Sequence, residues 1–160
     1  MAAVEREYHY HVDAEGRIFH DGTEIVDAPT LRFFVLAMQR TADARWLVVC
    51  QGERNWFHAE GSPLVVQRLH VETDGPGAPP RGIQLMLPGD HREALDPATL
   101  EQRDGRLYCR VRRGALPARF GRQAMQQLAP VLTEAGGRPA LALGGRLYPV
   151  AEAVASDAVR

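Results

Sequence analysis

Short apolar runs separated by turn residues constrain this chain more than any other feature, and they are clearest between Arg45 and Arg68. That stretch reads RWLVVCQGERNWFHAEGSPLVVQR, with one turn at 51–52 and a second at 60–63. Apolar runs of about four to eight residues between such turns have the length of strands rather than of helices. Three strands are therefore predicted, over residues 46–50, 53–59 and 64–71.

A helix is expected before the first of these strands. Asp27 offers a side-chain acceptor to free helix amides, and Pro29 falls in the first turn, where a missing N–H costs little. Leu31, Phe34 and Met38 recur at helical spacing, so this helix should pack against a sheet. Two short strands precede it, at residues 8–12 and 17–20, and the first half is predicted to be β-β-α-β-β-β.

The second half repeats part of this plan. A Gly-Arg-aliphatic-aromatic motif occurs three times, and two of its copies precede a proline by a similar distance. We expect a second helix to begin at Pro117 and to end near Pro130, followed by a hairpin over 139–150. The three copies begin at Gly16, Gly105 and Gly145.

The predicted fold is α+β, with two similar, mainly antiparallel sheet units that each carry one helix. Glycine and proline dominate the segment between them, which is typical of a linker. The expected organisation is an N-terminal ββαβββ unit over 1–73, a linker over 74–82, a C-terminal α+β unit over 83–150 and a tail over 151–160.

Composition excludes several classes of function. The net charge of −1 and the 45% of hydrophobic residues are those of an ordinary soluble protein, without a strong attraction to nucleic acid or membrane. No signal segment or membrane span is visible, so we expect a cytoplasmic protein. All 19 basic residues are arginine, which excludes a Schiff-base lysine and a P-loop lysine. We attribute this use of arginine in place of lysine to a G+C-rich genome. We expect Cys50 and Cys109 to be buried thiols.

Residues 50–57, CQGERNWF, and the opening residues 8–21 resemble the motifs of a small uncharacterised family with bacterial and animal members, the animal ones mitochondrial. The resemblance covers residues 8–70, although His9 and His11 stand where aromatic residues are usual. The plan is also similar to a second bacterial family of repeated β-β-α-β-β-β units, for which a signalling or ligand-sensing role has been suggested. Neither resemblance implies any catalytic residue.

The candidate site is a polar and aromatic cluster in the predicted strand 53–59. Alternation along a strand would place its acidic and amide side chains on one face and its basic and indole side chains on the other. No reaction motif accompanies the cluster, so we expect a non-catalytic binding or interaction module. A small anionic ligand or a protein segment would bind there or in the groove between the units. The predicted ligand-binding residues are Glu53, Arg54, Asn55, Trp56 and His58.

Two alternatives stay open. A small hydrolase or isomerase would use Glu53 or His58 as a general base. An RNA-binding protein would use the arginine face of residues 106–113, where arginines alternate around Tyr108. Residues 103–122 form a basic segment, with seven arginines against Asp104 alone, whereas residues 1–30 hold seven acidic residues and two arginines. Docking of the basic segment within the chain, or a homodimer, is therefore favoured over nucleic acid.

Metal binding is the weakest hypothesis. Two histidines two residues apart can bind zinc only if a further ligand comes from elsewhere, and the chain lacks the Cys-x-x-Cys and His-Glu-x-x-His motifs. We therefore expect no metal site and no cofactor. The ligand types considered are His9, His11, His20, His58 and Cys50.

Overall fold

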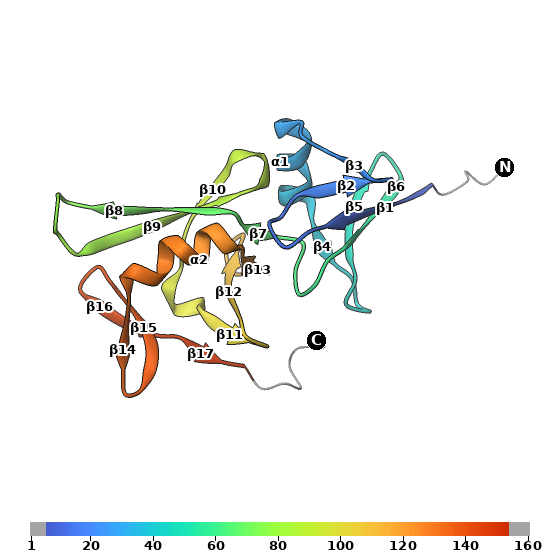
Figure 1. Ribbon diagram of the computed structural model, residues 1–160. Helices are drawn as coiled ribbons and strands as arrows, with labels where there is room; N and C mark the ends of the chain where they lie inside the picture. The colour runs from blue at the N-terminus through green and yellow to red at the C-terminus, as the bar shows by residue number, and fades with distance from the viewer. Residues whose placement is uncertain (1–5, 154–160) are drawn as a thin grey trace.

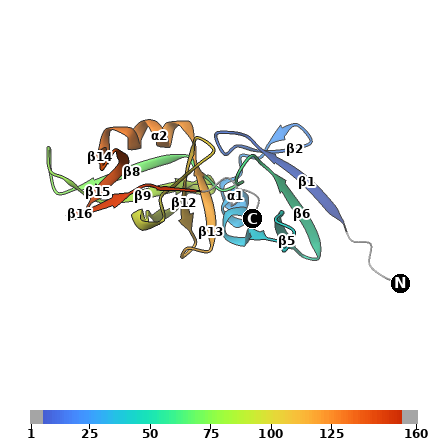
Figure 2. The same ribbon diagram turned by 90° about the horizontal axis from the view of Figure 1, so that it is seen from below.

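The computed structural model describes residues 6–153 of the protein, which form two groups of strands lying side by side (Figure 1). Figure 2 shows the same separation from a perpendicular direction. The two three-stranded sheets are antiparallel, and the six-stranded sheet is mainly antiparallel. Two helices pack on the sheets, so the predicted α+β class is confirmed. In the described part of the chain no helix has the length and apolar character needed to cross a bilayer.

The N-terminal group is a six-stranded sheet with one helix. Its strand order is β3-β2-β1-β6-β5-β4, and β1 and β6 pair in parallel at its centre. The helix covers one face, because Phe34 packs against Tyr10 and Phe57 of the sheet. The elements are β1 (Glu7–Val12), β2 (Ile18–His20), β3 (Thr23–Glu24), α1 (Ala28–Ala37), β4 (Gln39–Arg40), β5 (Trp46–Cys50) and β6 (Glu53–His58).

Helix α1 begins as the sequence predicts. Asp27 is its N-cap, and the Asp27 carboxylate accepts a hydrogen bond from the Thr30 amide at 3.0 Å. Proline occupies the first turn, and Phe34 and Val35 are buried. The helix ends before Met38, whose amide donates to the Phe34 carbonyl. Local sequence chemistry is therefore sufficient to explain where this helix lies.

The C-terminal group contains three smaller sheets. Their orders are β10-β9-β8, β17-β11-β12-β13-β7 and β14-β15-β16, and α2 lies against β8. The hairpin predicted over 139–150 is present, as β15 and β16. The elements are β7 (Val65–Val66), β8 (Arg68–Thr73), β9 (Pro80–Leu87), β10 (His91–Ala94), β11 (Glu101–Arg103), β12 (Arg106–Val111), β13 (Leu116–Phe120), α2 (Arg122–Leu128), β14 (Leu132–Ala135), β15 (Arg138–Leu143), β16 (Arg146–Pro149) and β17 (Ala151–Glu152), with short 3₁₀ turns at Pro88–Asp90, Pro97–Thr99 and Ala129–Val131.

The expectation that Pro117 begins a helix is wrong. Pro117 lies in β13 opposite Arg110, and α2 begins only after Gly121. The Arg119 amide, two residues later on the same strand edge, donates to Leu64 next to β7. The nitrogen of Pro117 faces the same edge of β13, but β7 pairs only with Arg119 and Phe120. The missing N–H of Pro117 therefore breaks no hydrogen bond to β7.

The segment 74–82 is not a free linker. Strands β8 and β9 pair antiparallel from Arg68 and Met86 to Thr73 and Pro80, so residues 74–79 form the turn of a hairpin. Proline is tolerated at the first position of a strand, which explains how β9 begins at Pro80. The boundary of the N-terminal unit at residue 73 stays a prediction, although β7 and β8 already pair with C-terminal strands.

The tail and the repeat have different outcomes. Ala151–Glu152 form β17 and pair with β11, whereas residues 154–160 lie outside the described part. The glycines that open the three repeated motifs all have positive φ, between 74° and 84°. The motif thus marks glycine-dependent turns before strands. That the halves are a duplication stays a prediction.

Two arginines of the C-terminal group bind main-chain carbonyls of the N-terminal group. Arg119 is 5% exposed, and its guanidinium donates to the Asp13 and Ala14 carbonyls at 3.3 and 3.1 Å. Arg112 donates to the Val35 and Met38 carbonyls at the end of α1. Apolar residues of both groups also belong to one continuous core. The two groups are therefore joined by shared apolar packing and by guanidinium contacts.

We predict that Arg119→Met lowers the free energy of unfolding by about 2 kcal/mol, because the Ala14 and Asp13 carbonyls each lose one donor while the cost of burying a charge is relieved. Urea denaturation measures this change. Arg122→Met, at an exposed position of α2, is the matched control and should change stability by less than about 0.5 kcal/mol. Equal stability of the two variants would show that the Arg119 contacts contribute nothing.

Candidate functional site

The five predicted site residues lie on the central strand β6, but they do not form one site. Asn55 faces α1, since its side chain accepts a hydrogen bond from the Tyr10 hydroxyl at 3.1 Å. His58 faces the other side of the sheet, where it contacts His9. The predicted alternation is present, and it divides the cluster between two surfaces.

Asn55 has a structural role. It is 6% exposed, and its amide nitrogen donates to the Val48 carbonyl at 3.0 Å while its oxygen accepts from Tyr10. Both ends of the amide are engaged in holding β1, β5 and β6 together. A buried side-chain amide needs hydrogen-bond partners, and Asn55 finds them within the sheet. The pairing of the strands therefore explains why an asparagine lies here.

Glu53 borders a groove of about 440 Å³ beside α1. Burial raises the pKa of Tyr10, which lies in this groove, and the Glu53 carboxylate raises it further. The lining contains no basic side chain, so the groove lacks a group that would attract an anion. It is lined by Tyr10, Pro29, Thr30, Phe33, Phe34, Cys50, Glu53 and Asn55.

Three histidines come together on the opposite face of the sheet. Parallel pairing of β1 and β6 places His11 opposite His58, and the His9 Nδ1 lies 2.8 Å from the His58 Nε2, so one of these nitrogens donates and the other accepts. Burial lowers the pKa of His58, and His9 and His11 lower it further. Within residues 6–153 no group of three or more His, Cys, Asp or Glu residues is arranged to hold a metal ion.

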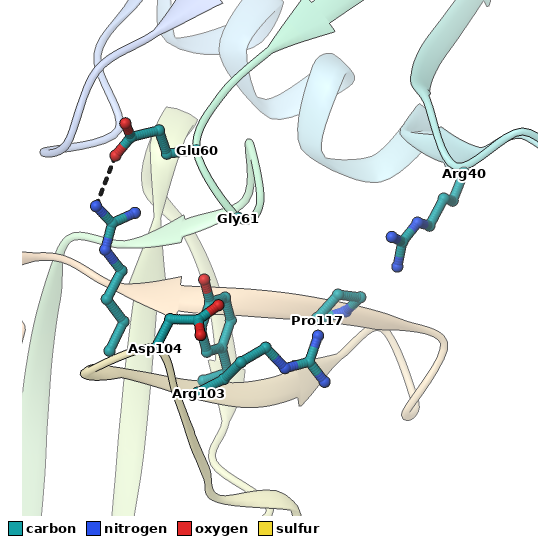
Figure 3. A pocket seen from close by; sticks show the side chains of 8 residues that line it. Arg40, Glu60, Gly61, Arg103, Asp104 and Pro117 are labelled. Carbon is teal, nitrogen blue, oxygen red and sulfur yellow. Dashed lines mark hydrogen bonds and ion pairs between the residues drawn. The ribbon is translucent and has the colours of Figure 1, made fainter. Parts of the chain in front are cut away.

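A second groove lies between the two groups of strands and has a different character. It is a cavity of about 380 Å³ at the end of β4, next to the turn after β6 and the β11–β12 hairpin (Figure 3). Segments far apart in the sequence contribute its basic side chains. It is lined by Arg40, Glu60, Gly61, Arg103, Asp104, Arg106, Tyr108 and Pro117.

Arg40 is the cation that lacks an acidic partner in this cavity. Its side chain points toward Pro117 and Arg103 (Figure 3). Its guanidinium carbon lies 5.2 Å from the centroid of the Trp46 ring. Its Nε is buried, and within residues 6–153 no hydrogen-bond partner meets that atom. Burial lowers the pKa of Arg40, and the nearby Arg103 and Arg110 lower it further. The lining thus holds three arginines against two carboxylates, Glu60 and Asp104.

The other two cavity arginines have acidic partners. The Arg106 Nη2 lies 2.6 Å from a carboxylate oxygen of Glu60, and the Arg103 Nη2 lies 3.0 Å from one of Glu101. The buried Nε of Arg103 has no partner in the described part of the chain. Asp104 is exposed at the rim, in the β11–β12 turn.

Gly61 allows the cavity wall to form. It has a φ of +78°, and a Cβ added there would lie 2.1 Å from the Tyr108 hydroxyl oxygen. Any other residue would therefore displace Tyr108, which is 8% exposed and stands between β11 and β13. Only glycine combines this backbone conformation with such close approach.

An adjoining cavity of about 370 Å³ shares Arg40 and Gly61 with the first. Trp56 and His58 border it, so two of the five predicted residues lie in the cavity that adjoins the groove between the halves. Sequence reasoning missed Arg40 and placed Arg103 only in a basic segment. A signal was available, because Arg103 and Arg106 flank an Asp-Gly turn that brings them to one hairpin end.

The arginine face expected on residues 106–113 is not an open nucleic-acid platform. Tyr108 is buried and offers no free ring face for stacking on a base. Arg106 pairs with Glu60, and Arg112 binds carbonyls of α1. Arg106 and Arg112 thus contact the other half of the same chain, whereas Arg110 donates to the Ala115 carbonyl of its own hairpin.

Comparison with known proteins supports the fold. No protein-family model and no curated protein matches the chain. A DUF1285 family protein from Silicibacter pomeroyi DSS-3 has a similar structure, with a TM-score of 0.65 and 16% identity over 92% of this chain and 83% of that chain. A DUF1285 family protein from Shewanella baltica OS155 gives a TM-score of 0.53 and 18% identity over 76% of this chain and 90% of that chain.

Identities this low show a shared fold and leave function open. The similarity agrees with the expected likeness to proteins of unknown function. The animal and mitochondrial members suggested by the sequence motifs stay a prediction.

We predict that His58 titrates below the ordinary histidine pKa, and that His9→Ala raises its pKa without restoring it fully, because burial is the larger cause of the shift. NMR titration of the imidazole resonances measures both values. His70→Ala, on exposed β8, should leave the pKa of His58 unchanged. A His58 pKa that is insensitive to His9→Ala would rule out the coupling of the two rings.

Proposed function

We propose that this protein is a non-catalytic binding module that holds a small anionic ligand in the groove between its two halves. The observation that carries the proposal is Arg40, a partly buried guanidinium that faces a cavity and lacks an acidic partner among the described residues. Arg103 and Arg106 converge on the same cavity. An anion would complete this arrangement.

Arg40 is a cation that is partly withdrawn from water. A buried charge without a partner is costly, and a buried N–H without an acceptor adds to that cost. An oxyanion would accept charge-assisted hydrogen bonds from the guanidinium groups of Arg40 and Arg103, which are stronger than neutral ones. Binding would therefore offset a cost that the free protein already bears.

The volume and shape favour a small ligand over a protein segment. A cavity of about 380 Å³ falls at the lower end of the range for small-molecule sites. Arg106 already pairs with Glu60 within one chain, so this arginine needs no homodimer to neutralise it. A homodimer stays a prediction that this site does not require.

The enzyme alternative is supported less well. Glu53 and His58 lie on opposite faces of β6, so they cannot act on the same substrate as an acid and base pair. His58 borders the adjoining cavity, but its nearest polar contact is His9 rather than a carboxylate. The arrangement lacks the positioned acid–base partner that a hydrolase or isomerase would need.

We predict that Arg40→Met weakens the binding of inorganic phosphate or pyrophosphate by about tenfold or more, because a charge-assisted hydrogen bond is lost while an unbranched apolar side chain is kept at this position. Isothermal titration calorimetry measures the affinities. Arg138→Met, at an exposed position of β15, removes the same charge elsewhere and should bind as the parent protein does. If both variants lose affinity equally, attraction by net charge explains binding and the site is wrong.

We predict that Asp104→Asn strengthens anion binding several-fold, because it removes a negative charge from the rim of the cavity. Asp104 has a φ of +51° and precedes Gly105, so asparagine suits this turn and the fold should be retained. The same calorimetric titration measures the gain. Unchanged or weaker binding in a folded Asp104→Asn variant would contradict an anion site at this position.

A further inference from the structure

We infer that the anionic ligand is a nucleoside monophosphate, whose phosphate occupies the Arg40 cavity and whose base stacks on Arg45 in the adjoining cavity. This inference rests on the proposed function and specifies the ligand class. It combines two observations, the convergence of guanidinium groups in one cavity and an exposed guanidinium plane in the next.

The first cavity favours phosphate over a carboxylate. Arg40, Arg103 and Arg106 reach it from three different strands, β4, β11 and β12. A planar carboxylate is satisfied by a single bidentate guanidinium, whereas a tetrahedral phosphate presents oxygens in several directions. Donors that converge from several sides therefore match the phosphate geometry better.

The second cavity has a flat cationic wall. The Arg45 guanidinium lies over the Trp56 ring, 4.0 Å from its centroid, and an ion pair of 2.7 Å to Asp43 holds it there. The Arg45 side chain is 58% exposed, so the guanidinium face turned away from Trp56 is open. Guanidinium planes stack on nucleobases, and Trp56 below supports this one as a rigid platform.

The two cavities are connected in a way that suits one ligand. Arg40 and Gly61 line both of them, so the two cavities adjoin at these residues. Gly61 has no side chain to narrow the passage, and Trp46 supports Arg40 from the second cavity. A sugar would occupy this junction, between the phosphate and the base.

A polynucleotide fits this arrangement poorly. Two cavities of about 380 and 370 Å³ are sites for a small molecule rather than a track for a strand. Tyr108 is buried, which leaves the neighbouring strand β12 without the aromatic platform used by single-stranded nucleic acids. The groove therefore points to a single nucleotide.

The experiment compares ligands that differ by one part. Calorimetry with the full chain measures the affinities of the four ribonucleoside 5′-monophosphates, ribose 5-phosphate and inorganic phosphate. At least one nucleotide should bind about tenfold more tightly than ribose 5-phosphate, the increment expected for stacking of one base. If ribose 5-phosphate binds as tightly as every nucleotide, the base contributes nothing and the nucleotide inference is overturned, while the anion site stands.

A variant separates stacking from charge. Arg45→Lys keeps the positive charge but removes the guanidinium plane, so it should abolish the preference for nucleotide over ribose 5-phosphate and leave ribose 5-phosphate affinity within about twofold. A preserved preference in folded Arg45→Lys overturns the stacking role. If none of the phosphate compounds binds the parent protein, the proposed function itself fails, and the two failures are thereby distinguished. Should Arg45→Lys not fold, the ligand series on the parent protein decides the question.

Discussion

Guanidinium groups bound to main-chain carbonyls hold the two halves of this molecule in register. Arg119 and Arg112 extend from the C-terminal strands and donate to carbonyls at the β1–β2 turn and at the end of α1. These arginines bind neutral oxygens, so charge pairing does not explain them. Planar guanidinium groups with several donors suit two carbonyls at once, and they fix direction as well as distance.

The groove follows from this docking. Arg40 ends β4 directly after α1, whereas Arg103 and Tyr108 belong to the β11–β12 hairpin of the other half. Neither half alone places the three together. Arg40 sits at the same boundary as Arg112 and Arg119, yet its Nε meets no carbonyl or carboxylate in residues 6–153. Arg112 and Arg119 bind main-chain carbonyls and support the interface. Arg40 lacks such partners at its Nε, and this difference marks it as the arginine for a ligand.

Local chemistry made part of the fold predictable. The Asp27 cap, the proline in the first turn and the apolar spacing define α1, and paired glycines define the last hairpin. Pro117 misled because proline opens helices and also occupies strand edges, and only the end of β7 decides between them. The segment 74–82 misled because glycine and proline are as typical of a long hairpin turn as of a linker.

The candidate site was predictable only in part. Alternation correctly separated Asn55 from His58, but the buried partners of Asn55 come from β1 and β5 and depend on tertiary pairing. The arginine excess was set aside as a property of the genome, which is reasonable for a count. What matters is that one arginine, Arg40, lies beside other arginines without an acidic partner among the described residues. The sequence does not show this, because it depends on how the fold brings β4 and β11 together.

The central claim is that an anion binds between the halves of the molecule at Arg40. A crystal grown with a heavy tetrahedral oxyanion such as tungstate, measured for anomalous scattering, tests this most directly. The account predicts an anomalous peak within hydrogen-bond distance of the Arg40 and Arg103 guanidinium groups. A peak elsewhere on the surface, with none in this cavity, would contradict it.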